Sequence, residues 1–465
     1  MSPLSSSHPL LDDTLRAVVR RYRPPSLDDV PAGAGSGNPA AALAILIERA
    51  RRALARGDTP DAALMHGFTD ALARLIDDAL QPGSGDPVFQ AMVLRHQVAR
   101  VREYASLAAH ADKDRRQVHA AVNAVAHPAK PARSGQGPVP QALESLHLAA
   151  SSASWLAVES AARALFALPG ADNDPALQRG VKRLLDGPEL GRLQRLDRLA
   201  SDEQVRLYQS LWSRHGPAPG SAGAVAQGAA SQQRGDAVEA QATRALEALA
   251  RRLNAASGAT GPYRVVTSMR VPSSMPGNPE RAKTEWDGVL LAQAGADVWD
   301  VCLLVEAKAS VEAASTDFPR LMRGLRLLAQ AEQDEIYAFP SRQGPVRLRG
   351  ASLRALPADE GGVADTVLYC CDASADTMPR LLGSAARMQL LSAQASVAYA
   401  SARVAQRDAD PPQLEPVWHQ LLASPQWRAV LHQYPTLCRV RELMVHVDDL
   451  LQAAAVGPQS RFSSP

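Results

Sequence analysis

An apolar run that ends in two charged residues constrains the fold of this chain more than any other feature. The run from Val298 to Val305 is almost wholly apolar, and Glu306, Ala307 and Lys308 follow it directly. A short apolar run of this kind predicts a strand that is buried on both faces. Glu306 and Lys308 are two residues apart, so they share one face of that strand. Because burying charges is costly, a strand end that carries both predicts a functional site.

A second acidic residue, Asp287, lies on the preceding predicted strand, Thr284–Ala292. The sequence between the two runs, residues 293–297, is typical of a turn, so we expect an antiparallel hairpin. If the turn centres on residues 296–297, Asp287 lies opposite Glu306, although a register shift of two residues remains open. Two carboxylates and one ammonium group would then meet at one end of the hairpin.

This set of residues is what metal-assisted hydrolysis of a phosphodiester bond requires. Carboxylate oxygens bind Mg²⁺, which polarises the phosphate and generates a nucleophilic hydroxide. An ammonium group such as that of Lys308 can orient the attacking water and offset the charge of the transition state. The sequence therefore predicts a site for Mg²⁺ or Mn²⁺ at Asp287 and Glu306, with nucleic acid as the substrate.

The elements predicted around this hairpin follow the order α-β-β-β-α-β, with one further strand. Their approximate ranges are a helix at 236–256, strands at 263–271, 284–292 and 298–309, a helix at 318–331, and strands at 335–339 and 366–371. Alternation between strands and helices predicts an α/β domain.

Over residues 235–375 the chain resembles the PD-(D/E)xK nuclease superfamily. Asp287 matches the first acidic residue of the family pattern, and Glu306-Ala-Lys308 matches its tripeptide. The resemblance implies a restriction-endonuclease-like core and Mg²⁺-dependent cleavage, with DNA favoured over RNA as substrate. It also implies an auxiliary metal ligand on the helix before the sheet. Glu239 stands at that position, and Glu247 competes with it two turns on.

Two further acidic residues compete for a ligand position. Trp286 precedes Asp287, where the family pattern has proline. Glu285 shares a face with Asp287, so it is either a rival ligand or an assistant to Asp287. Asp300 is another candidate, although it lies at the opposite end of its strand from Glu306.

Bulk charge gives no independent support for nucleic-acid binding. The chain has 50 Lys and Arg against 48 Asp and Glu, a formal net charge of +2, so binding would need a local basic patch. Arg320, Arg323 and Arg326 recur on one side of the predicted helix at 318–331 and could contact the nucleic-acid backbone. A solvated helix face explains the same three residues equally well.

The rest of the chain is predicted to be helical. We expect a flexible N-terminus at 1–40 with one short helix near residues 11–22, an all-α domain at 41–215, a Gly-, Ala- and Ser-rich linker at 216–234, the α/β core at 235–375, C-terminal helices at 376–456 and a loose tail at 457–465. The all-α N-terminal domain would bind a protein partner or target the substrate.

Composition excludes several other classes. No apolar run reaches the roughly 18 residues that a membrane span needs, and the N-terminus lacks the pattern of a secretory signal. We therefore expect a cytoplasmic protein whose cysteines are buried thiols. No phosphate-binding loop or histidine pair with zinc spacing is present. The sequence leaves the oligomeric state open.

A second class of function also fits the sequence. The nuclease-like fold could be a non-catalytic module for protein interaction or regulation, and such a module could be exported into another cell. The near-neutral charge favours this alternative, whereas the complete set of Asp287, Glu306 and Lys308 favours an enzyme.

Overall fold

The structure is a computed structural model of a mixed α/β protein in which helices predominate. It describes residues 9–24, 27, 37–129, 137–169, 171, 174–217, 220–257, 262–359, 361–375 and 380–455. These residues form two compact units. The first contains the described residues up to Leu75, those from 220 to Leu390 and those from Leu414 onward. The second contains those from Ile76 to 217 and Leu391–Gln413.

A mixed sheet lies in the first unit, with seven strands among the described residues. The strands are β1 (Tyr263–Arg270), β2 (Glu285–Gly295), β3 (Val298–Ala307), β4 (Ile336–Phe339), β5 (Val346–Arg349), β6 (Val367–Cys371) and β7 (Met444–His446). β1, β2 and β3 are antiparallel neighbours, and β4 pairs antiparallel with β5. β3 pairs in parallel with β5 near its start and with β6 at its end, and β6 also pairs in parallel with β7. The end of β3 is therefore held between β2 and β6.

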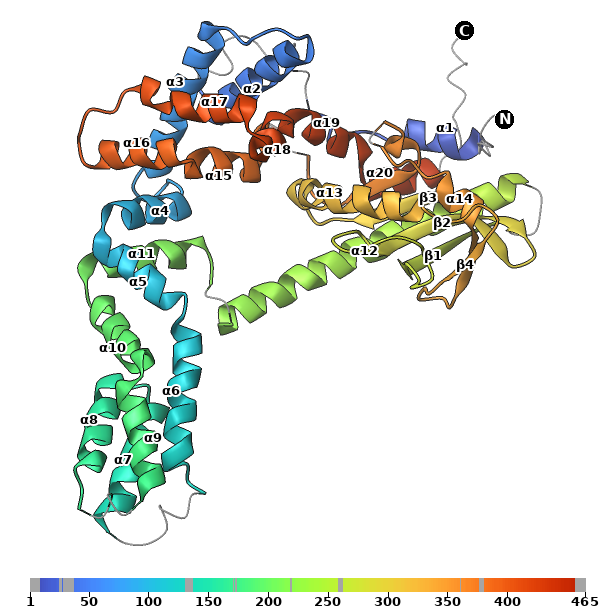
Figure 1. The fold of residues 1–465 in the computed structure, drawn as a ribbon. Helices are drawn as coiled ribbons and strands as arrows, with labels where there is room; N and C mark the ends of the chain where they lie inside the picture. Colours follow the sequence, from blue (N-terminus) through green and yellow to red (C-terminus); the bar gives the residue numbers. More distant parts are fainter. Residues whose placement is uncertain are drawn as a thin grey trace. The chain divides into compact units, whose positions relative to one another are not determined.

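Helices cover both faces of this sheet (Figure 1). On one face the apolar side chains of α1 (Pro9–Ala17), α12 (Ala222–Ser257) and α20 (Val447–Ala455) pack against the strands. On the other face lie α13 (Val311–Leu328), α14 (Gly350–Arg354) and α19 (Gln433–Leu443). Strands buried on both faces read as nearly continuous apolar runs, which explains the composition of β3 and β6.

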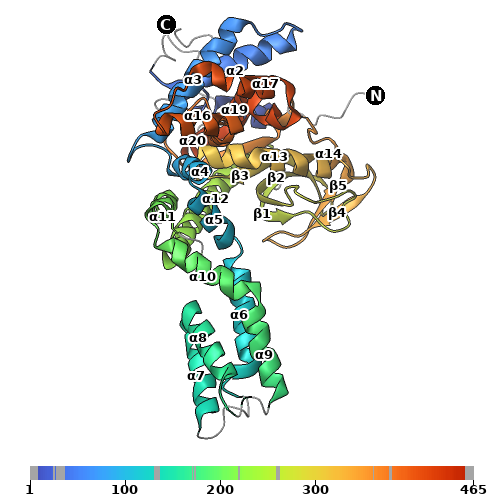
Figure 2. The same cartoon turned by 60° about the vertical axis from the view of Figure 1, so that its left-hand side comes forward.

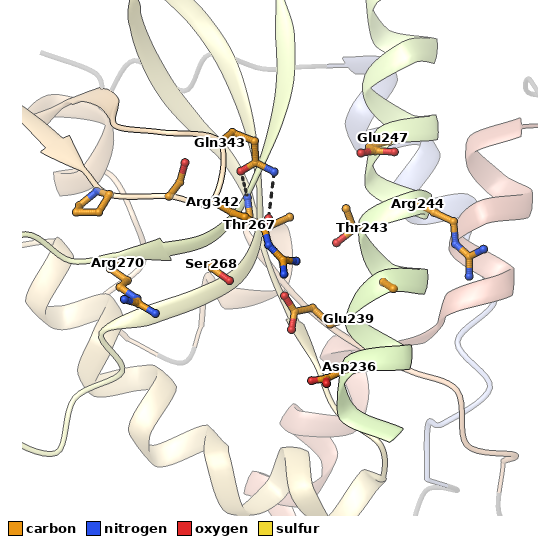
Figure 3. A pocket seen from close by; sticks show the side chains of 13 residues that line it. Asp236, Glu239, Thr243, Arg244, Glu247, Thr267, Ser268, Arg270, Arg342 and Gln343 are labelled. Carbon is orange, nitrogen blue, oxygen red and sulfur yellow. Dashed lines mark hydrogen bonds between the residues drawn. The ribbon is translucent and has the colours of Figure 1, made fainter. Parts of the chain in front are cut away.

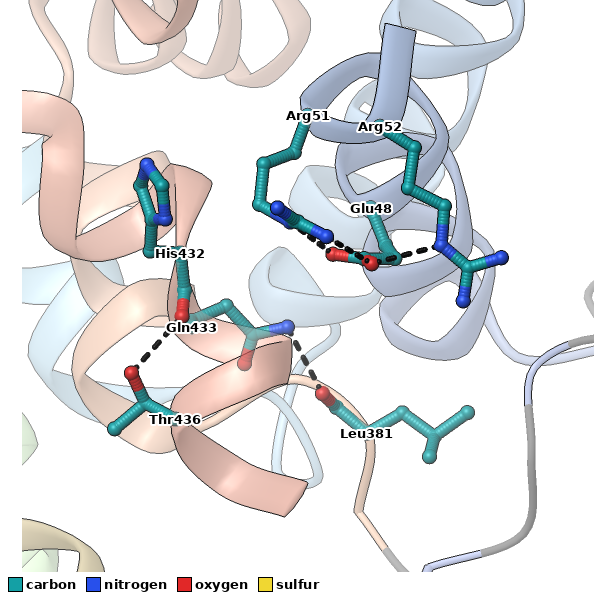
Figure 4. Close-up of polar contacts among 7 residues, drawn as sticks. All are labelled: Glu48, Arg51, Arg52, Leu381, His432, Gln433 and Thr436. Atoms are coloured by element: carbon teal, nitrogen blue, oxygen red, sulfur yellow. Dashed lines mark hydrogen bonds and ion pairs between the residues drawn. The ribbon is translucent and has the colours of Figure 1, made fainter. Parts of the chain in front are cut away.

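Polar contacts also stabilise the helical part of the first unit, which contains α2 (Pro39–Ala55), α17 (Glu415–Ala423) and α18 (Arg428–Leu431). It also contains α3 (Ala62–Leu80) up to Leu75 and α15 (Ser384–Ser392) up to Leu390. Glu48 on α2 is 3% exposed, and its carboxylate accepts hydrogen bonds from Arg51 at 2.7 Å and Arg52 at 2.9 Å (Figure 4). The amide of Gln433 donates to the Leu381 carbonyl at 3.1 Å. A buried carboxylate is tolerated here because arginines pair with it.

The second unit is all-helical within its described residues (Figure 2). Its helices are α4 (Pro87–Gln97), α5 (Ala99–Ala108), α6 (Ala111–Ala126), α7 (Pro138–Ser151), α8 (Trp155–Phe166), α9 (Pro175–Asp186), α10 (Pro188–Ala200), α11 (Glu203–His215) and α16 (Gln394–Val404). Helices α6 to α10 share one apolar core. The buried Asp114 is paired with Arg192, which donates to it at 2.6 and 2.8 Å.

The linker predicted at 216–234 is wrong from Ala222 onward, because α12 begins there. This part of α12 is exposed, and its buried residues begin only at Val238. Alanine has the highest helix propensity, and the alanines of this stretch offset its glycines. The next predicted helix, at 318–331, also begins earlier, at Val311, where the Ser310 side chain caps it.

The two units cut across the predicted domain boundaries. Residues 41–75 of the predicted all-α domain belong to the unit that holds the sheet. The predicted flexible N-terminus contains α1, whose Leu11 and Leu15 are buried in the sheet's core. β5 and β7 were not predicted, and β7 lies within the predicted C-terminal helices. The predicted tail at 457–465 lies outside the described residues.

No disulfide joins the four cysteines. Cys302, Cys370 and Cys371 are buried as predicted, whereas Cys438 is only partly buried, so its predicted burial is wrong. Burial raises the pKa of both the Cys302 and the Cys370 thiol to about 12. Among the described residues, no helix has the length and apolar character needed to cross a membrane.

The two halves of α12 are expected to respond differently to truncation. Leu249 is fully buried, so Leu249→Ala should lower the free energy of unfolding by about 2–5 kcal/mol. Val225 is 66% exposed on the same helix, and Val225→Ala should change it by less than about 0.5 kcal/mol. Urea denaturation followed by circular dichroism measures both. Equal effects of the two substitutions would contradict the packing of α12 described above.

Candidate functional site

The hairpin of β2 and β3 has the register that places Asp287 opposite Glu306. Gly295 pairs with Val298 across a turn at Ala296 and Asp297, and Asp297 has a φ of 60°. At the other end of the hairpin, Gly288 pairs with Val305. Register shifts interrupt the ladder between Leu290 and Leu291 and between Gln293 and Gly295. They add one residue to each strand, so they cancel and leave the predicted register intact.

Glu306 is the most buried charged group of the site, with an exposure of 0%. Its Oε2 atom lies 2.5 Å from Nζ of Lys283 and 3.3 Å from Nζ of Lys308. Its Oε1 atom is buried and has no hydrogen-bond partner among the described residues. Burial and the charge of Asp287 raise the pKa of Glu306 to about 8, although both lysines oppose the shift. An unpartnered buried oxygen calls for an explanation, and an ion is one of the few available.

Lys308 is held by a second carboxylate. Its Nζ atom lies 3.5 Å from Oδ2 of Asp317 on α13, and the hydroxyl of the buried Tyr369 on β6 donates to the same oxygen at 3.3 Å. Burial alone would lower the pKa of Lys308, but the charges of Glu306, Asp317 and Asp287 outweigh it and raise the pKa. Lys308 therefore stays protonated, as a group that stabilises negative charge must.

Asp287 is held at the site by a hydrogen bond to the backbone of β3. Its Oδ2 atom accepts a hydrogen bond from the Ala307 N–H at 2.9 Å, which fixes one oxygen of the carboxylate beside the Glu306–Lys308 strand end. Glu239 on α12 also belongs to this group of acidic residues. Burial raises the pKa of Glu239, and the charge of Asp287 raises it further. Two ammonium groups thus face the acidic side chains of Asp287, Glu306 and Asp317, with Glu239 nearby, so acidic groups outnumber ammonium groups.

A cleft of about 770 Å³ is lined by Glu239, whereas Asp287, Glu306 and Lys308 are not among its lining residues (Figure 3). Glu239 and Glu247 of α12 line one side of it, and Arg270 and Arg342 line the other. The Gln343 side chain braces the second side by accepting from the Thr267 N–H at 2.9 Å and donating to the Thr267 hydroxyl at 3.1 Å. The charge of Arg342 partly offsets the raised pKa of Glu239, so the two groups are electrostatically coupled.

The rival acidic residues lie elsewhere. The Glu285 carboxylate is 44% exposed and forms an ion pair with Arg270 at 3.2 Å. Asp300 forms an ion pair with Arg349, at the opposite end of β3 from Glu306. Neither residue faces Glu306 in these contacts, and each already has a cationic partner.

The three arginines predicted to contact nucleic acid, Arg320, Arg323 and Arg326, lie on the exposed side of α13. Arg320 is exposed, and its backbone carbonyl accepts a hydrogen bond from the Lys283 N–H at 3.1 Å. The guanidinium groups of Arg323 and Arg326 donate to the carbonyls of Arg281 at 2.7 Å and Ala358 at 3.1 Å. At least two of these arginines therefore also tie loops to α13, and their contact with nucleic acid stays a prediction.

A metal ion fits the donor chemistry of Asp287 and Glu306. Within the described residues, no three His, Cys, Asp or Glu side chains form a complete metal site by themselves. Mg²⁺ does not require one, because it commonly binds one or two carboxylates and fills its shell with water and substrate phosphate. The unpartnered Oε1 of Glu306 and the repulsion between the Glu306 and Asp287 carboxylates are the features that a cation would satisfy.

Three groups of this site are not predicted from the sequence: the buried Lys283 and Tyr369, and the partly buried Asp317. Lys283 precedes β2 in a polar stretch that resembles an ordinary loop. Asp317 lies on α13 and Tyr369 on β6, and only the tertiary fold brings them to Lys308. The sequence holds only an indirect signal for Asp317. An ammonium group at a buried strand end, such as that of Lys308, requires a carboxylate partner.

Comparison with protein-family models, curated proteins and solved structures gives no match.

Titration of Glu306 should make stability depend on pH. Its pKa is about 8 in the folded protein and about 4.3 in an unfolded chain. The unfolded state therefore loses this proton first as the pH rises. The stability of the wild type relative to Glu306→Gln should fall between about pH 5 and pH 8 and level off above it. Denaturation of both proteins in the presence of a chelator measures this difference, and a difference that does not vary with pH would refute the raised pKa.

Proposed function

We propose that the protein is a metal-dependent nuclease that hydrolyses phosphodiester bonds, with DNA favoured over RNA. Asp287 and Glu306 would hold Mg²⁺ or Mn²⁺, and Glu239 would assist. The observation that carries this proposal is the wholly buried Glu306, which has one oxygen without a partner and Asp287 opposite it across the hairpin. A purely structural ion pair does not need an orphaned carboxylate oxygen or a second acidic residue beside it.

Each residue has a distinct part in the proposed chemistry. A bound divalent ion would polarise the scissile phosphate and lower the pKa of a coordinated water. Lys308 would orient that water and offset the charge that develops on the phosphate oxygens. Asp317, backed by Tyr369, holds the Lys308 ammonium in place and is a positioning residue.

The arrangement of elements supports the assignment to the PD-(D/E)xK superfamily. In chain order α12, β1, β2, β3, α13 and β6 follow the α-β-β-β-α-β sequence, with the β4–β5 hairpin and α14 inserted before β6. The three antiparallel strands are followed by β6, which is parallel to β3. Asp287 lies near the start of β2, and Glu306 lies near the end of β3.

The cleft beside Glu239 supports nucleic acid as the substrate. Three arginines, Arg244, Arg270 and Arg342, line it together with three acidic residues, and none of its lining residues is aromatic. Guanidinium groups bind phosphate well, whereas base recognition in single strands commonly uses aromatic stacking. The cleft therefore suits the sugar-phosphate backbone more than the bases, and we expect cleavage with little dependence on base sequence.

The alternative, a non-catalytic interaction module, also has one observation in its favour. Lys283 and Lys308 already neutralise much of the charge of Glu306 without a metal. Under this alternative the buried cluster would only stabilise the sheet, and the helical unit would carry the binding surface.

Supercoiled plasmid provides a direct assay of the proposed activity. With Mg²⁺ or Mn²⁺ the wild type should nick it, and Lys308→Met should lower the rate by about 100-fold or more because transition-state charge loses its partner. Asp287→Asn should abolish cleavage, and Glu239→Gln should have an intermediate effect. Asp300→Asn is the matched control, since Asp300 pairs with Arg349 at the opposite end of β3 from Glu306, and it should retain activity within a few-fold. A folded wild type that leaves the plasmid intact would refute the proposal.

Binding to DNA should depend on Arg342. Arg342→Ala should weaken binding of a non-cleaved duplex in Ca²⁺ and reduce the slope of log affinity against log salt by about 1, because one phosphate contact is lost. Arg251→Ala removes an exposed arginine of α12 that does not line the cleft, so it should leave the slope unchanged. Fluorescence anisotropy at several salt concentrations measures both. Identical slopes for the two variants would show that the cleft does not bind the DNA backbone.

A further inference from the structure

Lys283 is a second buried ammonium group at the proposed metal site, and its position is closely fixed. Its side chain is 7% exposed, and its Nζ lies 5.9 Å from the centre of the Trp286 ring. Its backbone N–H donates to the Arg320 carbonyl at 3.1 Å. A side chain at Gly324 would come within 2.7 Å of the Lys283 carbonyl oxygen, so α13 can approach this residue only because position 324 is glycine.

The protein's own donors occupy one oxygen of each carboxylate at the site. Oε2 of Glu306 contacts Lys283 at 2.5 Å and Lys308 at 3.3 Å, whereas Oε1 has no partner among the described residues. Oδ2 of Asp287 accepts from the Ala307 N–H at 2.9 Å. Each carboxylate thus presents a single oxygen to a metal.

This distribution of partners limits the number of metal ions. Two-metal sites hold their ions about 3.5–4 Å apart, and carboxylate oxygens must face both ions. At Glu306 the oxygen that would face a second ion is already in contact with the two ammonium groups. Nζ of Lys283 is the closer of the two and carries a fixed positive charge where that second ion would bind.

We propose that Lys283 takes the place of a second metal ion, so that this site holds a single divalent cation, bound through Oε1 of Glu306 and through Asp287. The inference rests on the proposed metal-dependent function and adds the number of ions to it. Lys283 is a positioning residue in this account: it orients the Glu306 carboxylate and supplies the charge that a second ion supplies in two-metal sites.

Counting Mn²⁺ ions bound to the full-length protein tests this inference without any activity assay. Isothermal titration calorimetry gives the stoichiometry and affinity, and electron paramagnetic resonance distinguishes an isolated ion from a spin-coupled pair. The proteins are the wild type, Lys283→Met, which removes the ammonium group while keeping much of the side-chain volume, and Lys182→Met. Lys182 is exposed on α9 in the helical unit, so its replacement is the matched control.

The wild type and Lys182→Met should each bind one magnetically isolated Mn²⁺. Lys283→Met lacks a positive charge near the metal, so one of two results is expected. The variant should bind two ions, or it should bind one ion at least roughly tenfold more tightly than the wild type. Two ions in the wild type would overturn the inference and leave the proposed nuclease intact. Unchanged or weaker binding by folded Lys283→Met would overturn the role of Lys283. No binding by the wild type would overturn the proposed metal-dependent function itself. The wild-type count remains decisive if the variant does not fold.

Discussion

The contact of the Glu306 carboxylate with two ammonium groups is the interaction on which the rest of the site depends. Glu306 is wholly buried at the end of β3, and Lys283 and Lys308 approach the same oxygen. Removing one partner of a buried ion pair commonly costs about 3–5 kcal/mol, because the remaining charge is left unpaired. The fold therefore has to bring the segment before β2, the end of β3 and the face of α13 together in one arrangement.

Several features of the first unit can be understood from this requirement. Gly324 lets α13 approach the backbone at Lys283, and the two compensating irregularities of the hairpin keep Asp287 opposite Glu306. β6 pairs with the end of β3 and contributes the Tyr369 hydroxyl that holds Asp317. The outcome is a cluster in which acidic side chains outnumber ammonium groups, close to a cleft that arginines and acidic residues line together. The near-neutral charge of the whole chain is compatible with this local arrangement.

The part of the site that could be predicted from the sequence is the part with local signals. The turn at residues 296–297 and the apolar runs on either side of it predict Asp287 opposite Glu306, and the structure has that register. Lys283 could not be predicted, since its partner is more than 20 residues away and its position depends on Gly324 of another element. β5 and β7 are short strands stabilised by distant partners. The segment at 222–234 was predicted to be a linker from its glycine and serine, but its alanines continue α12 toward the N-terminus.

We propose that Asp287 and Glu306 bind a catalytic divalent cation. The position of that cation can be measured directly. Anomalous diffraction from crystals soaked in Mn²⁺ shows the ion independently of the protein density. We expect an anomalous peak for Mn²⁺ at roughly 2.0–2.2 Å from one oxygen of Asp287 and from Oε1 of Glu306. Lys283 should still contact Oε2 of Glu306. A peak only at other positions, or none at saturating Mn²⁺ with Glu306 contacting the lysines alone, would contradict this proposal.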